Sequence, residues 1–139
     1  MAKVWNKFTG FEDMAMRIKP AEKPTHKRPR HQAPEHLKFI RGLSCLTCGL
    51  PDHSDPHHLK PACYWAAKPS SGTMKPNDSW TVPLCRLCHN ECEQWSAGEW
   101  EWWCLHSMYG IDYAFKIALA LWEATGDYER GEQIIRANR

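Results

Sequence analysis

The sequence predicts a small α+β fold, with short elements in its middle and helices in its last third. Two Cys-x-x-Cys pairs enclose a stretch rich in Pro, Asp, His and Gly, which is the composition of turns. The run 80–84 has strand character and ends at Cys85. Apolar residues then recur at helical spacing toward the C-terminus. The length of 139 residues suits one domain.

The first segment, residues 1–34, is predicted to be an irregular arm, because four prolines interrupt any helix. Residues 1–41 carry ten Lys and Arg against four Asp and Glu, whereas 42–139 carry eight against twelve. This asymmetry fits either an arm that binds nucleic acid through its charge or a solvated tail. If the arm binds nucleic acid, the expected contacts are Lys27, Arg28, Arg30, Lys38 and Arg41.

The remaining elements follow from local signals. A brief helix or turn is expected over 35–44, and a Pro-, Ser- and Gly-rich loop over 61–79. A helix is expected from Cys88 to about Trp95. Ser96 and Glu99 then fit a capping box for a helix over 100–109, which Gly110 would end.

Two more helices complete the chain. Asp112 is expected to cap a helix over 113–124, which is apolar on most faces and so predicted to be buried. An amphipathic helix should follow over 128–137. Four tryptophans recur at near-helical spacing, and a packed core explains them better than a base-stacking surface does: Trp95, Trp100, Trp103 and Trp122.

The cysteine pairs, Cys45 with Cys48 and Cys85 with Cys88, indicate a metal site. Two thiolates three residues apart on a tight turn can face one tetrahedral Zn²⁺, and Gly49 suits such a turn. Four thiolates leave no open position, so this zinc would be structural. A cysteine pair on a turn, followed by one at a helix start, is the treble-clef arrangement.

The seven cysteines are an odd number, and the first residues do not resemble a signal peptide. No apolar run is long enough to span a membrane. A soluble protein of a reducing compartment is therefore expected. The other cysteines, Cys63, Cys92 and Cys104, are expected to be buried and inert, with Cys92 near enough to the second pair to compete for a metal.

Histidines lie between and after the cysteine pairs. His57 and His58 are adjacent and follow Asp55. On a strand they would point to opposite sides, so that one can bind a metal while the other faces a water molecule. His89 and Glu93 are four residues apart, share a face of the expected helix and can hold one cation.

The order Cys-x-x-Cys, His-His and Leu-Cys-x-x-Cys-His, over residues 45–93, resembles the zinc-bearing HNH (ββα-metal) endonucleases. Residues 40–43, 55–59 and 80–85 resemble more closely the small phage-encoded group that includes the RecA-dependent Ref-type nuclease. Further likeness at 110–112 and 118–122 extends the resemblance over about 36–136.

The resemblance implies a role for each histidine. His58 matches the general base, and His57 and His89 match ligands of a catalytic Mg²⁺ or Mn²⁺. Glu93 stands where many members have a further histidine. The position of the family's middle asparagine is occupied by Trp80. Just upstream, Asn77 and Asp78 either orient His58 or touch the metal, or form an ordinary turn.

As a whole, the resemblance implies a basic arm (1–34), a nuclease core (35–95) and a helical C-terminal extension (96–139). It implies a phage or prophage endonuclease for DNA recombination or processing, acting in the host cytoplasm. DNA would be its partner, with a RecA-type recombinase filament as a further one and no membrane. The alternatives are a non-catalytic treble-clef module that binds DNA and needs no histidines, and a zinc-dependent interaction protein acting through its C-terminal helices.

Overall fold

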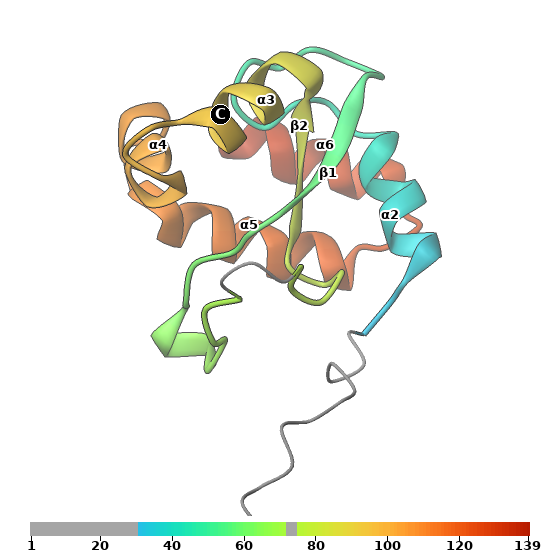
Figure 1. Ribbon diagram of the computed structural model, residues 1–139. Helices are drawn as coiled ribbons and strands as arrows, with labels where there is room; N and C mark the ends of the chain where they lie inside the picture. Colours follow the sequence, from blue (N-terminus) through green and yellow to red (C-terminus); the bar gives the residue numbers. More distant parts are fainter. Residues whose placement is uncertain (1–30, 72–74) are drawn as a thin grey trace, which may run out of the picture.

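The computed structural model describes residues 31–71 and 75–139, and these form a small α+β fold (Figure 1). Within them lie five α-helices, a 3-10 helix and a two-stranded sheet, which confirms the predicted α+β class. In chain order the elements are α2 (Pro34–Arg41), β1 (Ser54–His58), η1 (Tyr64–Ala66), β2 (Thr81–Cys85), α3 (Arg86–Gln94), α4 (Glu99–His106), α5 (Gly110–Glu123) and α6 (Tyr128–Ala137).

The sheet is an antiparallel ribbon in which Ser54 lies opposite Cys85 and His58 opposite Thr81. Pro56 faces Pro83 at its centre. Proline donates no hydrogen bond, and a two-stranded ribbon tolerates it because each strand has a free edge. In Figure 1, α2 lies on one side of the strands, and α3 and α4 lie on the other.

Strand β2 is buried along its whole length and passes directly into α3. The strand predicted at 80–84 is therefore confirmed with a shift of one residue. The helix begins at Arg86, two residues before the predicted start at Cys88. The second cysteine pair thus spans the junction between strand and helix.

The predicted capping box before α4 is wrong. The residue that precedes the helix is Gly98, with φ 94°, and no side chain caps it. The Glu99 carboxylate instead accepts a hydrogen bond from Nε2 of His57 at 2.7 Å. A buried imidazole offers this carboxylate a stronger partner than an exposed amide does, because the hydrogen bond forms in a lower dielectric. Ser96 is exposed and outside the helix.

Two other predicted ends differ from the structure, and one is confirmed. Gly110 does not end a helix but opens α5, with φ 63°. Asp112 therefore lies in the first turn of α5 rather than before it, and it accepts a hydrogen bond from Nε1 of Trp65 at 3.3 Å. Helix α6 has the predicted bounds, and Asp127 caps it by accepting from the backbone N–H of Arg130 at 3.1 Å.

A single core cluster joins the sheet to the helices, with contributions that include Phe39, Val82, Trp102, Phe115 and Ile135. Trp102 and Trp103 are fully buried and meet edge to face at 4.9 Å between ring centroids. The tryptophan spacing identified Trp103 correctly but missed Trp102, and Trp100 is 62% exposed. Within the described ranges, no helix has the length and apolarity needed to cross a bilayer.

Candidate metal centres

The four predicted zinc ligands, Cys45, Cys48, Cys85 and Cys88, come together. Their Sγ atoms all lie within 4.8 Å of one another, and those of Cys48 and Cys85 are 3.5 Å apart. With Zn–S bonds of 2.3 Å, the sulfurs of a zinc tetrahedron are about 3.8 Å apart. The cluster can therefore hold a metal such as zinc with little movement.

The backbone explains why the two pairs meet. The N–H of Leu46 donates to the carbonyl oxygen of Pro83 at 2.9 Å, which fixes the first pair beside β2. The N–H of Gly49 donates to the carbonyl of Cys45 at 2.9 Å, with φ 78° at the glycine. A residue with a side chain rarely adopts this conformation, so the predicted need for Gly49 at the turn is confirmed.

The surroundings favour a thiolate at Cys45. Burial alone would raise its pKa, but hydrogen bonds from the N–H groups of Cys48, Thr47 and Cys85 and from the Thr47 hydroxyl lower the pKa of Cys45 to about 6. Partial burial and the neighbouring thiols raise the pKa of Cys88 above its ordinary value. A divalent cation would replace the protons of all four thiols, since metal binding and deprotonation are linked.

A second cluster consists of His57 on β1 with His89 and Glu93 on α3. Nδ1 of His57 and Nε2 of His89 each lie 3.6 Å from Oε1 of Glu93, and the two rings are 5.1 Å apart. The side chain of His57 is 1% exposed, and its Nδ1 has no hydrogen-bond partner among the described residues. A buried nitrogen without a partner is costly, and a cation at this point would satisfy it.

A carboxylate contacts the ring nitrogen that points away from Glu93 in each of the two histidines. Glu99 accepts from Nε2 of His57, and a carboxylate can only accept, so the proton lies on Nε2 and the lone pair on Nδ1. Asp55 lies 3.5 Å from Nδ1 of His89 and 3.1 Å from Nε of Arg86. Such contacts leave the nitrogens that face Glu93 as donors to a metal.

Lys60 places a positive charge beside the histidine cluster. Its Nζ lies 3.0 Å from Oε2 of Glu93. Partial burial would raise the pKa of Glu93, but this ammonium and the two neighbouring imidazoles hold the pKa below its ordinary value. The N–H of Lys60 also donates to Glu99 at 3.3 Å. Sequence reasoning missed both Lys60 and Glu99, because their partners lie more than 30 residues away.

His58 has a separate carboxylate partner. Its Nε2 lies 2.9 Å from Oδ1 of Asp78, which is 1% exposed and whose Oδ2 accepts from the N–H of Ala33 at 2.8 Å. Asn77 instead accepts from the N–H of His31 at 3.0 Å. Of the two upstream candidates, Asp78 therefore orients His58. The partner of His57, Glu99, lies on α4, whereas the partner of His58 lies in the loop before β2, so the two rings have different surroundings, as side-chain alternation along a strand predicts.

The other predicted residues have varied surroundings. The ring of Trp80 packs edge to face on Phe115 at 5.8 Å, so an aromatic core residue holds the position of the expected asparagine. Lys38 and Arg41 are exposed on α2. The remaining expected nucleic-acid contacts, Lys27, Arg28 and Arg30, and most of the predicted arm lie outside the described residues.

The three remaining cysteines only partly follow expectation. Cys63 and Cys92 are buried as predicted. Cys104 is exposed, because on α4 it follows the buried Trp102 and Trp103 and turns away from the core. Sγ of Cys92 lies 3.7 Å from Nε2 of His57, so this thiol adjoins the histidine cluster rather than the four-cysteine cluster.

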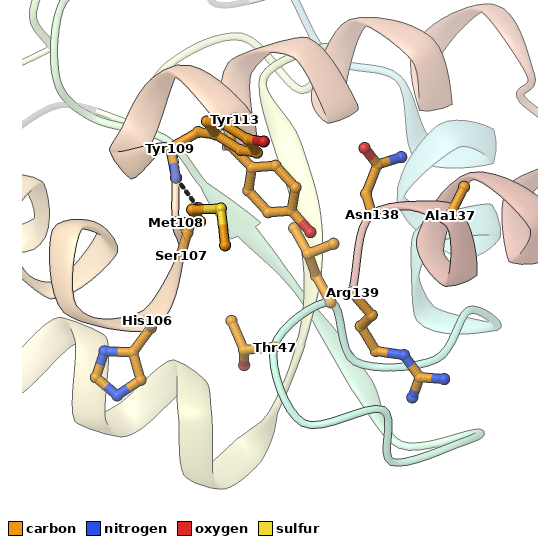
Figure 2. Close-up of a pocket in the computed structure, with 10 residues that line it drawn as sticks. Thr47, His106, Ser107, Met108, Tyr109, Tyr113, Ala137, Asn138 and Arg139 are labelled. Carbon is orange, nitrogen blue, oxygen red and sulfur yellow. Dashed lines mark hydrogen bonds between the residues drawn. The ribbon is translucent and has the colours of Figure 1, made fainter.

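A pocket of about 350 Å³ lies between the turn of Cys45 and Cys48, the α4–α5 connection and the C-terminal residues (Figure 2). Its walls include Thr47, Met108, Tyr109, Tyr113 and Arg139. None of the clustered cysteines, histidines or glutamates lines it. Its size therefore does not make it the chemical centre of the protein.

Comparison with known proteins gives one match. The model of a family of proteins of unknown function, DUF968, matches residues 20–119. No curated protein and no solved structure matches the chain. The matched range includes both cysteine pairs, the histidine cluster and its carboxylate partners. Because the match covers most of the sequence, the chain belongs to the DUF968 family.

Proposed function

We propose that this protein is a metal-dependent endonuclease of the HNH type that hydrolyses phosphodiester bonds in DNA. The observation that carries the proposal is a strand–strand–helix unit, β1–β2–α3, that bears two different sets of ligands. One set is four thiolates, which closes the coordination of a zinc ion. The other is two imidazoles and a carboxylate, which leaves positions open for a substrate.

The cation held by His57, His89 and Glu93 would be Mg²⁺ or Mn²⁺. When bound, it supplies positive charge that stabilises the phosphate and the leaving oxygen. The buried Nδ1 of His57, which has no hydrogen-bond partner within 31–71 and 75–139, supports this site. Glu99 and Asp55 keep the two imidazoles in the tautomers that the ligands need.

His58 is the general base of the proposal. Asp78 holds the proton on Nε2, which leaves a lone pair on Nδ1 to accept a proton from the attacking water. The carboxylate of Asp78 then stabilises the imidazolium that forms.

The substrate would be held mainly through its phosphates. Lys38 and Arg41 are exposed on α2, and the N-cap residue of this helix, Ala33, donates its N–H to Asp78. Contacts of this kind fix position without reading sequence. The basic residues before α2 would add charge-based phosphate contacts of the same kind. A phage origin, a recombination role and cooperation with a RecA-type filament rest on the resemblance of the motifs to Ref-type nucleases.

A nicking assay on supercoiled and single-stranded DNA tests the proposal, with Mg²⁺, Mn²⁺ or EDTA, and with and without a recombinase filament. His58→Ala should reduce metal-dependent cleavage by about 10²- to 10⁴-fold, the usual contribution of a general base. His53→Ala is the matched control, because His53 is exposed and belongs to none of the candidate metal-binding groups in the part of the chain that the structure describes. Its rate should equal that of the wild type.

Asp78→Asn separates orientation from charge at the base. An amide can present N–H to Nε2 and favour the other tautomer, so cleavage should fall while the fold and zinc content remain. Full cleavage by His58→Ala would refute the assignment of the base. Tight DNA binding without cleavage under any condition would favour the non-catalytic treble-clef module instead.

A further inference from the structure

His57 faces a second group of potential ligands through its other ring nitrogen. Nε2 lies 2.7 Å from Oε1 of Glu99 and 3.7 Å from Sγ of Cys92. One donor atom from each of the three residues lies within 4.8 Å of the others. The donors come from β1, α3 and α4, so the fold and not local sequence brings them together.

This group is accessible although its members are largely buried. All three side chains line a pocket of about 150 Å³, together with Lys60, Glu93, Trp95 and Gly98. The pocket holds neither His58 nor any zinc-ligand cysteine. An ion can therefore reach the group from solvent and keep a water molecule as a further ligand.

The donor atoms of the two groups favour different ions. Zn²⁺ in proteins is bound by three kinds of side-chain group, which are imidazole, thiolate and carboxylate. Mg²⁺ and Mn²⁺ prefer oxygen and do not take thiolates. The group of His57, Cys92 and Glu99 therefore suits a thiolate-binding ion, and binding would release the thiol proton of Cys92 to solvent. The group of His57, His89 and Glu93 contains no sulfur.

The two groups cannot both use His57, because a neutral imidazole has one lone pair. With the proton on Nε2, the lone pair on Nδ1 can bind a cation together with His89 and Glu93. With a metal on Nε2, the proton moves to Nδ1 and that group loses a ligand. We propose that a thiolate-binding ion such as Zn²⁺ binds His57 Nε2, Cys92 and Glu99 and so displaces the hard cation from His57. The inhibition rests on the proposed nuclease function, whereas the binding does not.

Cobalt titration tests the binding. The four-cysteine cluster is first filled with one equivalent of Zn²⁺, and Co²⁺ is then added while thiolate-to-cobalt charge-transfer absorption is recorded. We expect a cobalt–thiolate band in the wild type and in Cys63→Ser, which removes another buried thiol. The band should be absent in Cys92→Ser. Co²⁺ held by His57, His89 and Glu93 gives no such band, so its absence in the wild type would overturn the proposal.

Glu99→Gln provides a second variant that keeps the thiol. Its affinity for Co²⁺ should fall by at least about 10-fold, the usual effect of losing even an outer partner of a metal site. Unchanged affinity would overturn the assignment of Glu99 as a ligand. Circular dichroism and zinc content establish that each variant is folded before its titration.

Zinc inhibition of Mn²⁺-dependent cleavage tests the consequence. Each variant is compared with its own rate before Zn²⁺ is added. Wild type and Cys63→Ser should be inhibited, and Cys92→Ser should need at least about 10-fold more Zn²⁺. Equal inhibition of Cys92→Ser would show that zinc acts elsewhere and would overturn the displacement. A cobalt–thiolate band in a protein without nuclease activity would keep the site and remove the proposed function.

Discussion

His36 should make the stability of the fold fall at mildly acidic pH. Its side chain is 1% exposed, and Nδ1 lies 2.7 Å from the hydroxyl of Thr125. The ring of Trp122 packs edge to face on it at 4.8 Å. Burial lowers the pKa of His36 to about 4, although the negative charge of Asp78 opposes the shift.

The direction of the effect follows from this pKa. Because the folded value is lowered, the unfolded chain takes up the proton first as the pH falls. The stabilisation by neutral His36 is therefore complete above pH 6.5 and is lost as the pH falls from 6.5 toward 4. With these two pKa values, the loss between pH 7.5 and 5.0 is about 2 kcal/mol of unfolding free energy.

Urea unfolding at pH 7.5 and 5.0, with saturating Zn²⁺, measures this loss for the wild type and for His36→Gln. Glutamine does not titrate, so the pH dependence of the variant should be smaller by about 2 kcal/mol, with unchanged denaturant slopes. His53→Gln removes an exposed histidine and should keep the wild-type pH dependence. Equal pH dependence in the wild type and His36→Gln would refute the reasoning.

Three other substitutions test parts of the fold. Cys48→Ser should release zinc and unfold the domain, because structural zinc contributes on the order of 10 kcal/mol; metal analysis and circular dichroism check this, with Cys104→Ser unchanged. Lys68→Met leaves three backbone carbonyls without the buried ammonium they bind, and urea unfolding should show a loss of about 1–3 kcal/mol. In Gly131→Ala the new methyl group would lie 2.8 Å from Leu43, so thermal unfolding should show a loss of about 1–3 kcal/mol.

The sequence predicts most accurately those features that depend on contacts between residues close together in the chain. The spacing of Cys45 and Cys48 already fixes two thiols on one turn, and the positive φ of Gly49 follows from that turn. The bounds of α6 follow from its amphipathic period and the cap at Asp127. In these cases one local conformation satisfies the backbone and the side chains together, so tertiary structure has nothing to override.

Long-range competition explains the errors. Glu99 fits a capping box with Ser96, and that motif satisfies every local rule. The fold instead offers Glu99 the Nε2 of His57, 42 residues away, and the carboxylate bonds to it. Trp102 is missed for a similar reason, since α4 packs on α5 with a broader face than helical period alone suggests. The local sequence contains no signal for the contact of Glu99 with His57 or for the burial of Trp102.

These contacts make the helical last third part of the candidate site. A division at residue 95 would assign His57 to the core and Glu99 to an extension. Yet Glu99 decides which nitrogen of His57 carries the proton, and Nε1 of Trp103 donates to the same carboxylate oxygen at 3.4 Å. Any change that moves α4 would therefore alter the donor that β1 presents to a metal. The four-cysteine cluster brings the turn of Cys45 and Cys48 to the junction of β2 and α3. Glu99 on α4, by contrast, determines which nitrogen of His57 is a donor to a metal.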